Sequence, residues 1–135
     1  MTDPGWALQK AVYARLTSDA AVMAALGGAK VYDHVPRRTP KPYVTFGRNV
    51  VRDFSTSDAE AHEHDLALHV WAGAKGRKET AAILDAVRSS LHDGALALDG
   101  HRLINLRHTA SEITSEDDGE TLEGIARFRA VTEVA

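Results

Sequence analysis

The most regular pattern of apolar and polar positions in the chain runs from His64 to His92, and its period changes midway. In the first part every second residue is apolar, which predicts a strand with one buried face: Leu66, Leu68, Val70 and Ala72. In the second part the apolar residues recur at helical spacing, which predicts an amphipathic helix near Lys78 to Leu91: Ala81, Leu84, Val87 and Leu91. Gly94 is expected to end that helix. Each segment of this strand–turn–helix unit can bury the apolar face of the other.

The N-terminal part of the chain is predicted to hold two helices. Asp3 followed by Pro4 is a typical helix start, because the aspartate caps free amides and the proline has none to leave unpaired. The residues after it recur with helical periodicity, in a core stripe and an adjoining stripe: Leu8, Val12 and Leu16, then Trp6 and Tyr13. A second helix spans Ala20 to Leu26, and the glycine pair that follows stops it. Both helices are interpreted as facing the core.

Short strands are predicted on either side of the proline-rich stretch. Lys30 to Val35 is expected to be a strand, and Tyr43 to Arg48 another whose buried face the pattern leaves open. The prolines between them cannot donate to a sheet, which predicts a loop or an edge. Arg52 to Glu60 is polar and has no period, so we expect a loop there that leads into the strand after His62.

The C-terminal part is predicted to be a pair of antiparallel strands. Ala95 to Ile104 contains an Asp-Gly pair between apolar runs, which is a hairpin signal. Alternation continues to Ala110, and Ser115 to Glu120 forms an acidic turn before a last strand, Thr121 to Val134. That strand has an apolar face and a charged face. The sequence therefore predicts an α+β fold, mainly antiparallel sheet with amphipathic helices packed on it, as one domain over residues 1–135.

Composition narrows the classes of function. The chain has 135 residues, of which 44% are hydrophobic and 26% charged, and its net charge is −3. A protein that grips nucleic acid usually carries a basic surface, so this balance argues against that role. The chain contains no cysteine, which excludes disulfides and thiolate chemistry. We find neither a signal peptide nor an apolar run of membrane-spanning length, and we expect a soluble protein made in a cytoplasm.

One group of residues suggests metal chemistry. His62 and His64 lie two apart on a predicted strand and therefore point the same way, and His69 is close in sequence. The alternative hypothesis for the chain is accordingly a small metal-dependent enzyme or ligand-binding module that uses these three histidines. The spacing does not match the zinc motif H-E-x-x-H, and the sequence identifies no further ligand. A solvated strand end explains the residues without a metal.

Two charged turns have simpler explanations than a ligand site. The turn Gly73 to Lys78 precedes a helix, but it fits neither the phosphate-loop nor the dinucleotide pattern. Its basic residues are interpreted as a solvated turn or a subunit contact: Lys75, Arg77 and Lys78. The turn Ser115 to Glu120 lacks the ligand spacing of a calcium loop and is interpreted as a solvated hairpin tip. The sequence has no catalytic serine motif, and no pair of its carboxylates can be placed across a cleft, so an enzyme is the weaker hypothesis and no cofactor is expected.

The order of these segments resembles the bacteriophage tail-terminator or tail-completion family, which also occurs in gene-transfer-agent gene clusters. The matching segments are LQKAVYARLTSDAAVMAALGG, KVYDHVPRRTPKPYVTFGR, HVWA, TAAILDAVRSSLHD, LINLRHTASEI and ARFRAVTEV. They cover nearly the whole chain, and the chain departs from the family at AKGRKE, where a small polar cap is usual. The resemblance implies an α+β structural virion protein without catalytic residues.

The resemblance also implies how such a protein works. It implies a hexameric ring at the head-proximal end of the tail, which caps the tail tube, stops its polymerisation and joins the tail to the head connector. DNA passes through the bore without specific binding, and the absence of a net positive charge agrees with this. The expected partners are therefore other copies of the chain, the tail-tube protein and the head-connector or stopper protein. No contact with a membrane is expected.

Charged residues of the last strand pair are the candidates for these contacts. Three arginines are expected on the exposed faces of the pair, and four acidic residues at the tip between its strands: Arg107, Arg127 and Arg129, then Glu116, Asp117, Asp118 and Glu120. Opposite charges on separate surfaces of one subunit suit head-to-tail contacts around a ring. A solvated face explains the same residues without a partner.

Overall fold

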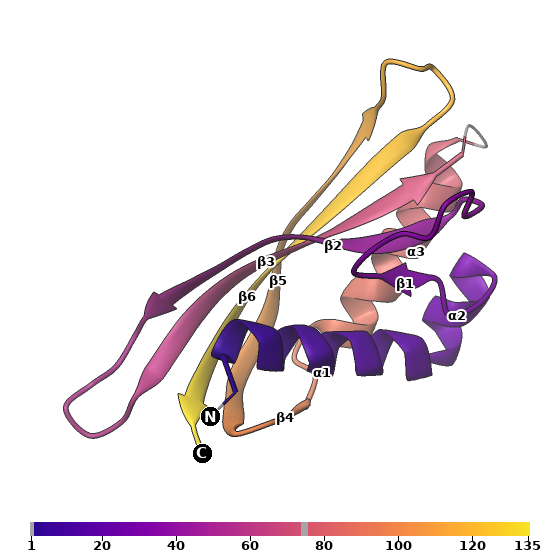
Figure 1. Ribbon diagram of the computed structural model, residues 1–135. Helices are drawn as coiled ribbons and strands as arrows, with labels where there is room; N and C mark the ends of the chain where they lie inside the picture. The colour runs from indigo at the N-terminus through magenta and orange to yellow at the C-terminus, as the bar shows by residue number, and fades with distance from the viewer. Residues whose placement is uncertain (1, 74–75) are drawn as a thin grey trace.

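The computed structural model describes residues 2–73 and 76–135. Three helices cover a six-stranded sheet of order β1-β2-β3-β6-β5-β4 (Figure 1). The helices are α1 (Pro4–Ser18), α2 (Ala20–Leu26) and α3 (Arg77–Leu91). The strands are β1 (Val31–Tyr32), β2 (Tyr43–Asp53), β3 (Ala61–Ala72), β4 (Ala97–Leu98), β5 (His101–Ser115) and β6 (Leu122–Val134).

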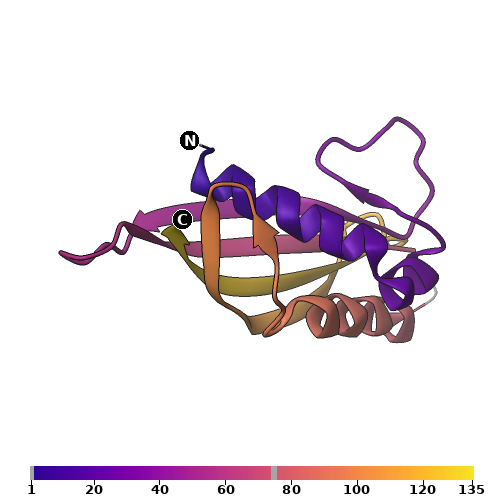
Figure 2. The ribbon, with the colours of Figure 1, turned by 90° about the horizontal axis from the view of Figure 1, so that it is seen from below.

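The sheet is antiparallel except for the short parallel pair of β1 and β2. Figure 2 shows α1 and α3 on the same side of the sheet, which leaves the other side without a helix. The β2–β3 and β5–β6 hairpins project from opposite ends of the sheet (Figure 1). The predicted α+β architecture, a mainly antiparallel sheet with amphipathic helices packed on it, is confirmed. No helix in the described ranges is both long enough and apolar enough to span a membrane.

The two N-terminal helices begin and end where the sequence predicts. The Asp3 carboxylate accepts a hydrogen bond from the Trp6 amide at 3.0 Å, with Pro4 in the first turn. Gly27 closes α2 at φ 77°, a left-handed conformation that glycine adopts without strain. The adjoining stripe of α1 does not face the core: Trp6 is 48% exposed and Tyr13 46%. The residues of α1 that face the core are those of the other stripe, which are fully buried: Leu8, Val12 and Leu16.

Helix α3 lies close to β6 because β6 has a glycine at the contact. A Cβ on Gly124 would lie 3.0 Å from the Leu84 side chain. The buried face of α3 differs from the predicted stripe in that Ala81 is exposed, whereas Ile83 is buried. The end of the helix also differs, since Asp93 rather than Gly94 takes the left-handed conformation, at φ 56°.

Strand lengths and neighbours differ from the predictions in several places. The strand expected over Lys30 to Val35 is reduced to the two residues of β1. Strand β2 continues to Asp53, so the polar loop predicted from Arg52 begins only after Asp53. The last strand begins at Leu122 and pairs with β3 as well as with β5, which makes it a central strand. The predicted Asp-Gly hairpin is confirmed between β4 and β5, with Gly100 at φ 77°.

Candidate interaction surface

The side of the sheet without helices, here called the open face, carries several ion pairs. Because strand side chains alternate, the residues of β3 and β6 with odd numbers lie on this face. The Arg129 guanidinium lies 2.6 Å from the Glu63 carboxylate, and Arg127 lies 3.1 Å from Glu112. Arg52 of β2 pairs with Asp65 at 2.6 Å. Exposed pairs of this kind contribute little to stability, so these groups can exchange partners at low cost.

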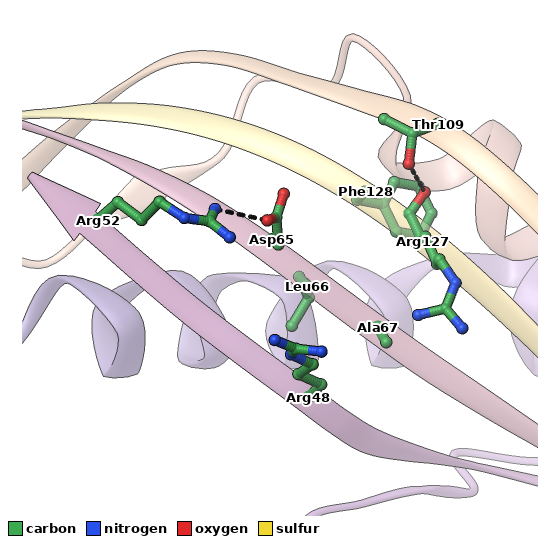
Figure 3. A pocket seen from close by; sticks show the side chains of 8 residues that line it. All are labelled: Arg48, Arg52, Asp65, Leu66, Ala67, Thr109, Arg127 and Phe128. Atoms are coloured by element: carbon green, nitrogen blue, oxygen red, sulfur yellow. Dashed lines mark hydrogen bonds and ion pairs between the residues drawn. The ribbon is translucent and has the colours of Figure 1, made fainter. Parts of the chain in front are cut away.

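A hollow of about 290 Å³ opens in the middle of this face (Figure 3). Ala67 lies at its floor, and Arg48 and Arg127 lie on either side of it. Arg48 forms no ion pair with any other described residue, so its charge is available to an anionic partner. Arg48 and Arg52 were not predicted from the sequence, because the predicted strand ended at residue 48. Strand β2 runs on to Asp53, and a register shift between Phe46 and Asn49, which alternation alone does not predict, changes which of its residues lie on this face.

The structure brings together the three arginines selected from the sequence. Arg107 lies directly opposite Arg129 in the β5–β6 register, and Arg127 lies two residues before Arg129 on the same face of β6. Arg107 also approaches Asp93 at 3.5 Å. Like charges directly opposite each other in a sheet repel, and here Glu63 beside Arg129 and Asp93 beside Arg107 offset that repulsion.

The acidic tip, residues 116–120, lies at the end of the β5–β6 hairpin and away from the three arginines. The Asp118 carboxylate accepts hydrogen bonds from the amides of Glu120 and Thr121, each at 2.9 Å. These bonds hold the pKa of Asp118 below its usual value, and the bond from the Glu120 amide has the largest effect. Asp118 therefore shapes the turn, whereas the carboxylates of Glu116, Asp117 and Glu120 form no ion pair with another described residue.

The basic turn before α3 is only partly described, since Lys75 lies outside the described residues. Arg77 and Lys78 are exposed in the first turn of α3. Arg77 Nη1 donates to the Ile113 carbonyl of β5 at 3.3 Å, which places the start of α3 beside the end of the β5–β6 hairpin. The two charged turns that the sequence treats separately thus lie at the same end of the molecule.

The proposed histidine group is not a cluster. His64 is fully buried on the helix-bearing face, where its Nε2 lies 2.9 Å from the Thr132 hydroxyl. His69 lies on the open face, stacked on Trp71 and 3.1 Å from the Glu123 carboxylate. The neighbour of His62 is instead His101, with ring centres 6.4 Å apart. Within residues 2–73 and 76–135, no group of three potential ligands is placed to hold a metal ion.

Comparison with known proteins gives a consistent result. The model of one protein family, described as tail completion protein gp17, matches residues 10–133. A chain of the solved structure "Virion of native gene transfer agent (GTA) particle" is 31% identical, with a TM-score of 0.86 over 93% of this chain and 94% of that one. The solved structure of bacteriophage SPP1 gp17 protein is 27% identical, with a TM-score of 0.61 over 93% and 88% of the two chains. No curated protein matches at a significant level.

Proposed function

The chain belongs to the tail completion protein gp17 family, and on that premise we propose that it forms a ring that ends the tail of a phage or gene-transfer-agent particle. The ring caps the tail tube, stops its polymerisation and joins it to the head connector, and DNA passes through the bore. Membership in a structural family also confirms that the chain is not an enzyme, so the metal-dependent enzyme proposed on His62, His64 and His69 is wrong.

The observation that best supports a place in a virion is the similarity to a chain of the gene-transfer-agent particle, which extends over 93% of this chain. The charge of the open face fits a DNA conduit, because four of its basic side chains are already paired with carboxylates or lie beside one. A bore that neutralised many phosphates would hold the duplex instead of letting it pass. A net charge of −3 for the whole chain agrees with this.

The subunit contacts are proposed to join opposite charges. The acidic tip of one copy meets the arginines of the next: Arg107, Arg127 and Arg129 against Glu116, Asp117, Asp118 and Glu120. Within one subunit the three arginines pair with Asp93, Glu112 and Glu63 and not with the acidic tip, which supports a head-to-tail contact between the two groups in neighbouring copies. The basic residues before and at the start of α3, Lys75, Arg77 and Lys78, are proposed to contact a neighbour, the tube or the connector.

The test is deletion of the protein in a host that makes the particles. Deletion is expected to give tails of uncontrolled length, or tails that fail to join heads, as seen by electron microscopy. Full-length tails attached to filled heads in the deletion strain would show that the proposal is wrong.

The contact residues are tested by reversing charge at the acidic tip. Glu116→Lys with Asp117→Lys should abolish incorporation into particles and leave the free subunit folded. These two positions leave the hydrogen bonds of Asp118 in place. The matched control, Glu116→Asp with Asp117→Glu, keeps the charge and should assemble as the wild type does. Normal incorporation of the reversed variant would exclude the tip as a contact.

A further inference from the structure

The two outer edges of the sheet are protected to different degrees. At the β5 edge, the loop after α3 covers the strand: the Asp93 amide donates to the Leu106 carbonyl at 2.7 Å, and the His108 amide donates to His92 Nδ1 at 2.9 Å. Beyond Ala110, α3 and the loop after it make one hydrogen bond to the backbone of β5 among the described residues, from the Arg77 side chain to the Ile113 carbonyl. The last residues of β5, from 110 to 115, therefore form an edge that a partner strand can reach.

The β2 edge is open over a longer stretch. Strand β1 pairs only with Val44 and Thr45, so from Phe46 to Asp53 the side of β2 that faces away from β3 has no strand beside it among the described residues. Val51 is an exposed apolar side chain of this stretch, at 37%, and Phe54, which is 49% exposed, follows directly after the end of β2. Exposed strand edges with apolar side chains pair readily with another chain, and proteins usually protect them.

An apolar groove lies beside each of these edges. The groove between α1 and the β1–β2 edge has a volume of about 520 Å³ and is lined by Trp6, Tyr13 and Phe46 among others. The groove between α3 and β5 has a volume of about 490 Å³, with Leu84 and Ile113 in its wall. Both grooves adjoin helices that lie on the same side of the sheet, so a sheet continued from one copy to the next would bring them together (Figure 2).

We propose that the β2 edge of one copy pairs with the end of β5 in the next copy, so that the sheet continues around the ring. This inference rests on the proposed function, and it names the joint that the ring would use. Along the sheet order β2-β3-β6-β5 every pair is antiparallel, so β2 and β5 run in opposite directions. Two copies in the same orientation would therefore meet as an antiparallel pair, the more stable kind of ladder.

Charge complementarity selects a second copy as the occupant of the β2 edge. Arg48 and Arg52 belong to the β2 edge, and Arg48 has no intramolecular carboxylate partner among the described residues. The end of β5 carries Glu112 and leads to Glu116, whose carboxylate also forms no ion pair with a described residue. An antiparallel joint places this acidic stretch beside the two arginines, and it seats the exposed Trp6 and Tyr13 against the groove at α3 of the neighbour.

The geometry of the joint makes the assembly directional. The two edges are different surfaces, so the contact is heterologous and each copy uses one edge for each neighbour. Their free stretches lie toward opposite ends of the sheet, where the two hairpins project (Figure 1). Each copy must therefore be displaced along its strands relative to the last, which lets neighbouring hairpins overlap.

Engineered cysteines test the joint directly, because the natural chain has none that could form a competing disulfide. Val50→Cys is combined in turn with Glu112→Cys and with Thr114→Cys, which lie on β2 and β5. The variants are produced in the particle-making host, and purified particles are oxidised and run on a non-reducing gel. A ladder of linked copies is expected from at least one pair and from none of the single variants. The control pair, Arg102→Cys with Thr114→Cys, has both positions on β5. It should give no ladder, because a head-to-tail joint never brings the β5 edges of two copies together.

The same particles separate the failure of this inference from the failure of the proposed function. If the cysteine variants enter particles with normal tails but give no ladder, the joint between β2 and β5 is wrong and the terminating role stands. If wild-type chain is absent from the particles, the proposed function fails and the joint with it. Charge reversal gives a second measurement: Arg48→Glu should reduce incorporation at least tenfold, whereas Arg48→Lys, which keeps the charge, should assemble as the wild type does. Unchanged incorporation of Arg48→Glu would exclude the contact.

Discussion

Acidification should destabilise this protein mainly through the buried His64. His64 is 0% exposed, and burial lowers the pKa of its imidazole from 6.5 to about 4. The pKa value of about 4 includes a smaller lowering by the positive charges of His62 and His101, and the Asp3 carboxylate opposes it. The neutral ring is therefore part of the folded core, where its Nε2 meets the Thr132 hydroxyl at 2.9 Å.

The sign of the effect follows from linkage. Because the folded-state pKa lies below the unfolded value, the unfolded chain binds the proton first, and stability falls as the pH decreases. The contribution is complete above the unfolded value of 6.5 and is lost progressively down to about 4. For these two values the loss at about pH 5 is roughly 2 kcal/mol, and it reaches about 3 kcal/mol once the folded ring is protonated.

The assay compares urea unfolding at about pH 7.5 and about pH 5 in the wild type and in His64→Gln, whose amide can keep a bond to Thr132 without titrating. The wild type should lose roughly 2 kcal/mol more than the variant over this interval. His34→Gln, which removes an exposed histidine, should lose as much as the wild type. If His64→Gln does not fold, titration of the His64 ring by NMR in the wild type gives the same answer. Equal losses in wild type and His64→Gln, or a His64 midpoint near 6.5, would refute the argument.

Three further predictions concern stability and dynamics. Leu84→Asp should lower the free energy of unfolding by about 3 kcal/mol or more, because an unpaired charge would enter the contact with Gly124. The control Ala81→Asp, on the exposed side of α3, should leave stability nearly unchanged. Thermal unfolding of the two variants measures the difference. Gly124→Ala should cost about 1–3 kcal/mol, since its Cβ would lie 3.0 Å from Leu84 and Thr80, and normal denaturant stability would count against tight packing there. The loops over Arg52 to Glu60 and Ser115 to Glu120 should gain hydrogen-exchange protection on assembly, and equal protection in free and assembled protein would contradict a contact role.

The sequence predicted most of the elements because their signals are local. Asp3 and Pro4 start α1, the glycine after Leu26 ends α2, and the alternation from Leu66 to Ala72 forms β3 with the expected face buried. Each of these signals depends on residues within one or two turns or a few strand positions. The arginine face was also predictable in part, since alternation alone puts Arg127 and Arg129 on the same side of β6.

The tertiary structure decided which elements became neighbours. Strand order places β6 between β3 and β5, and this pairing brings Glu63 to Arg129 across 66 positions in the chain. It also separates His69 from His64, which the sequence had grouped, and brings His101 to His62 instead. Periodicity specifies which face of a segment is apolar but not which other segment covers it. The choice of partner depends on long-range packing, so the open β2 edge and the exposed Trp6 became visible only in the folded chain.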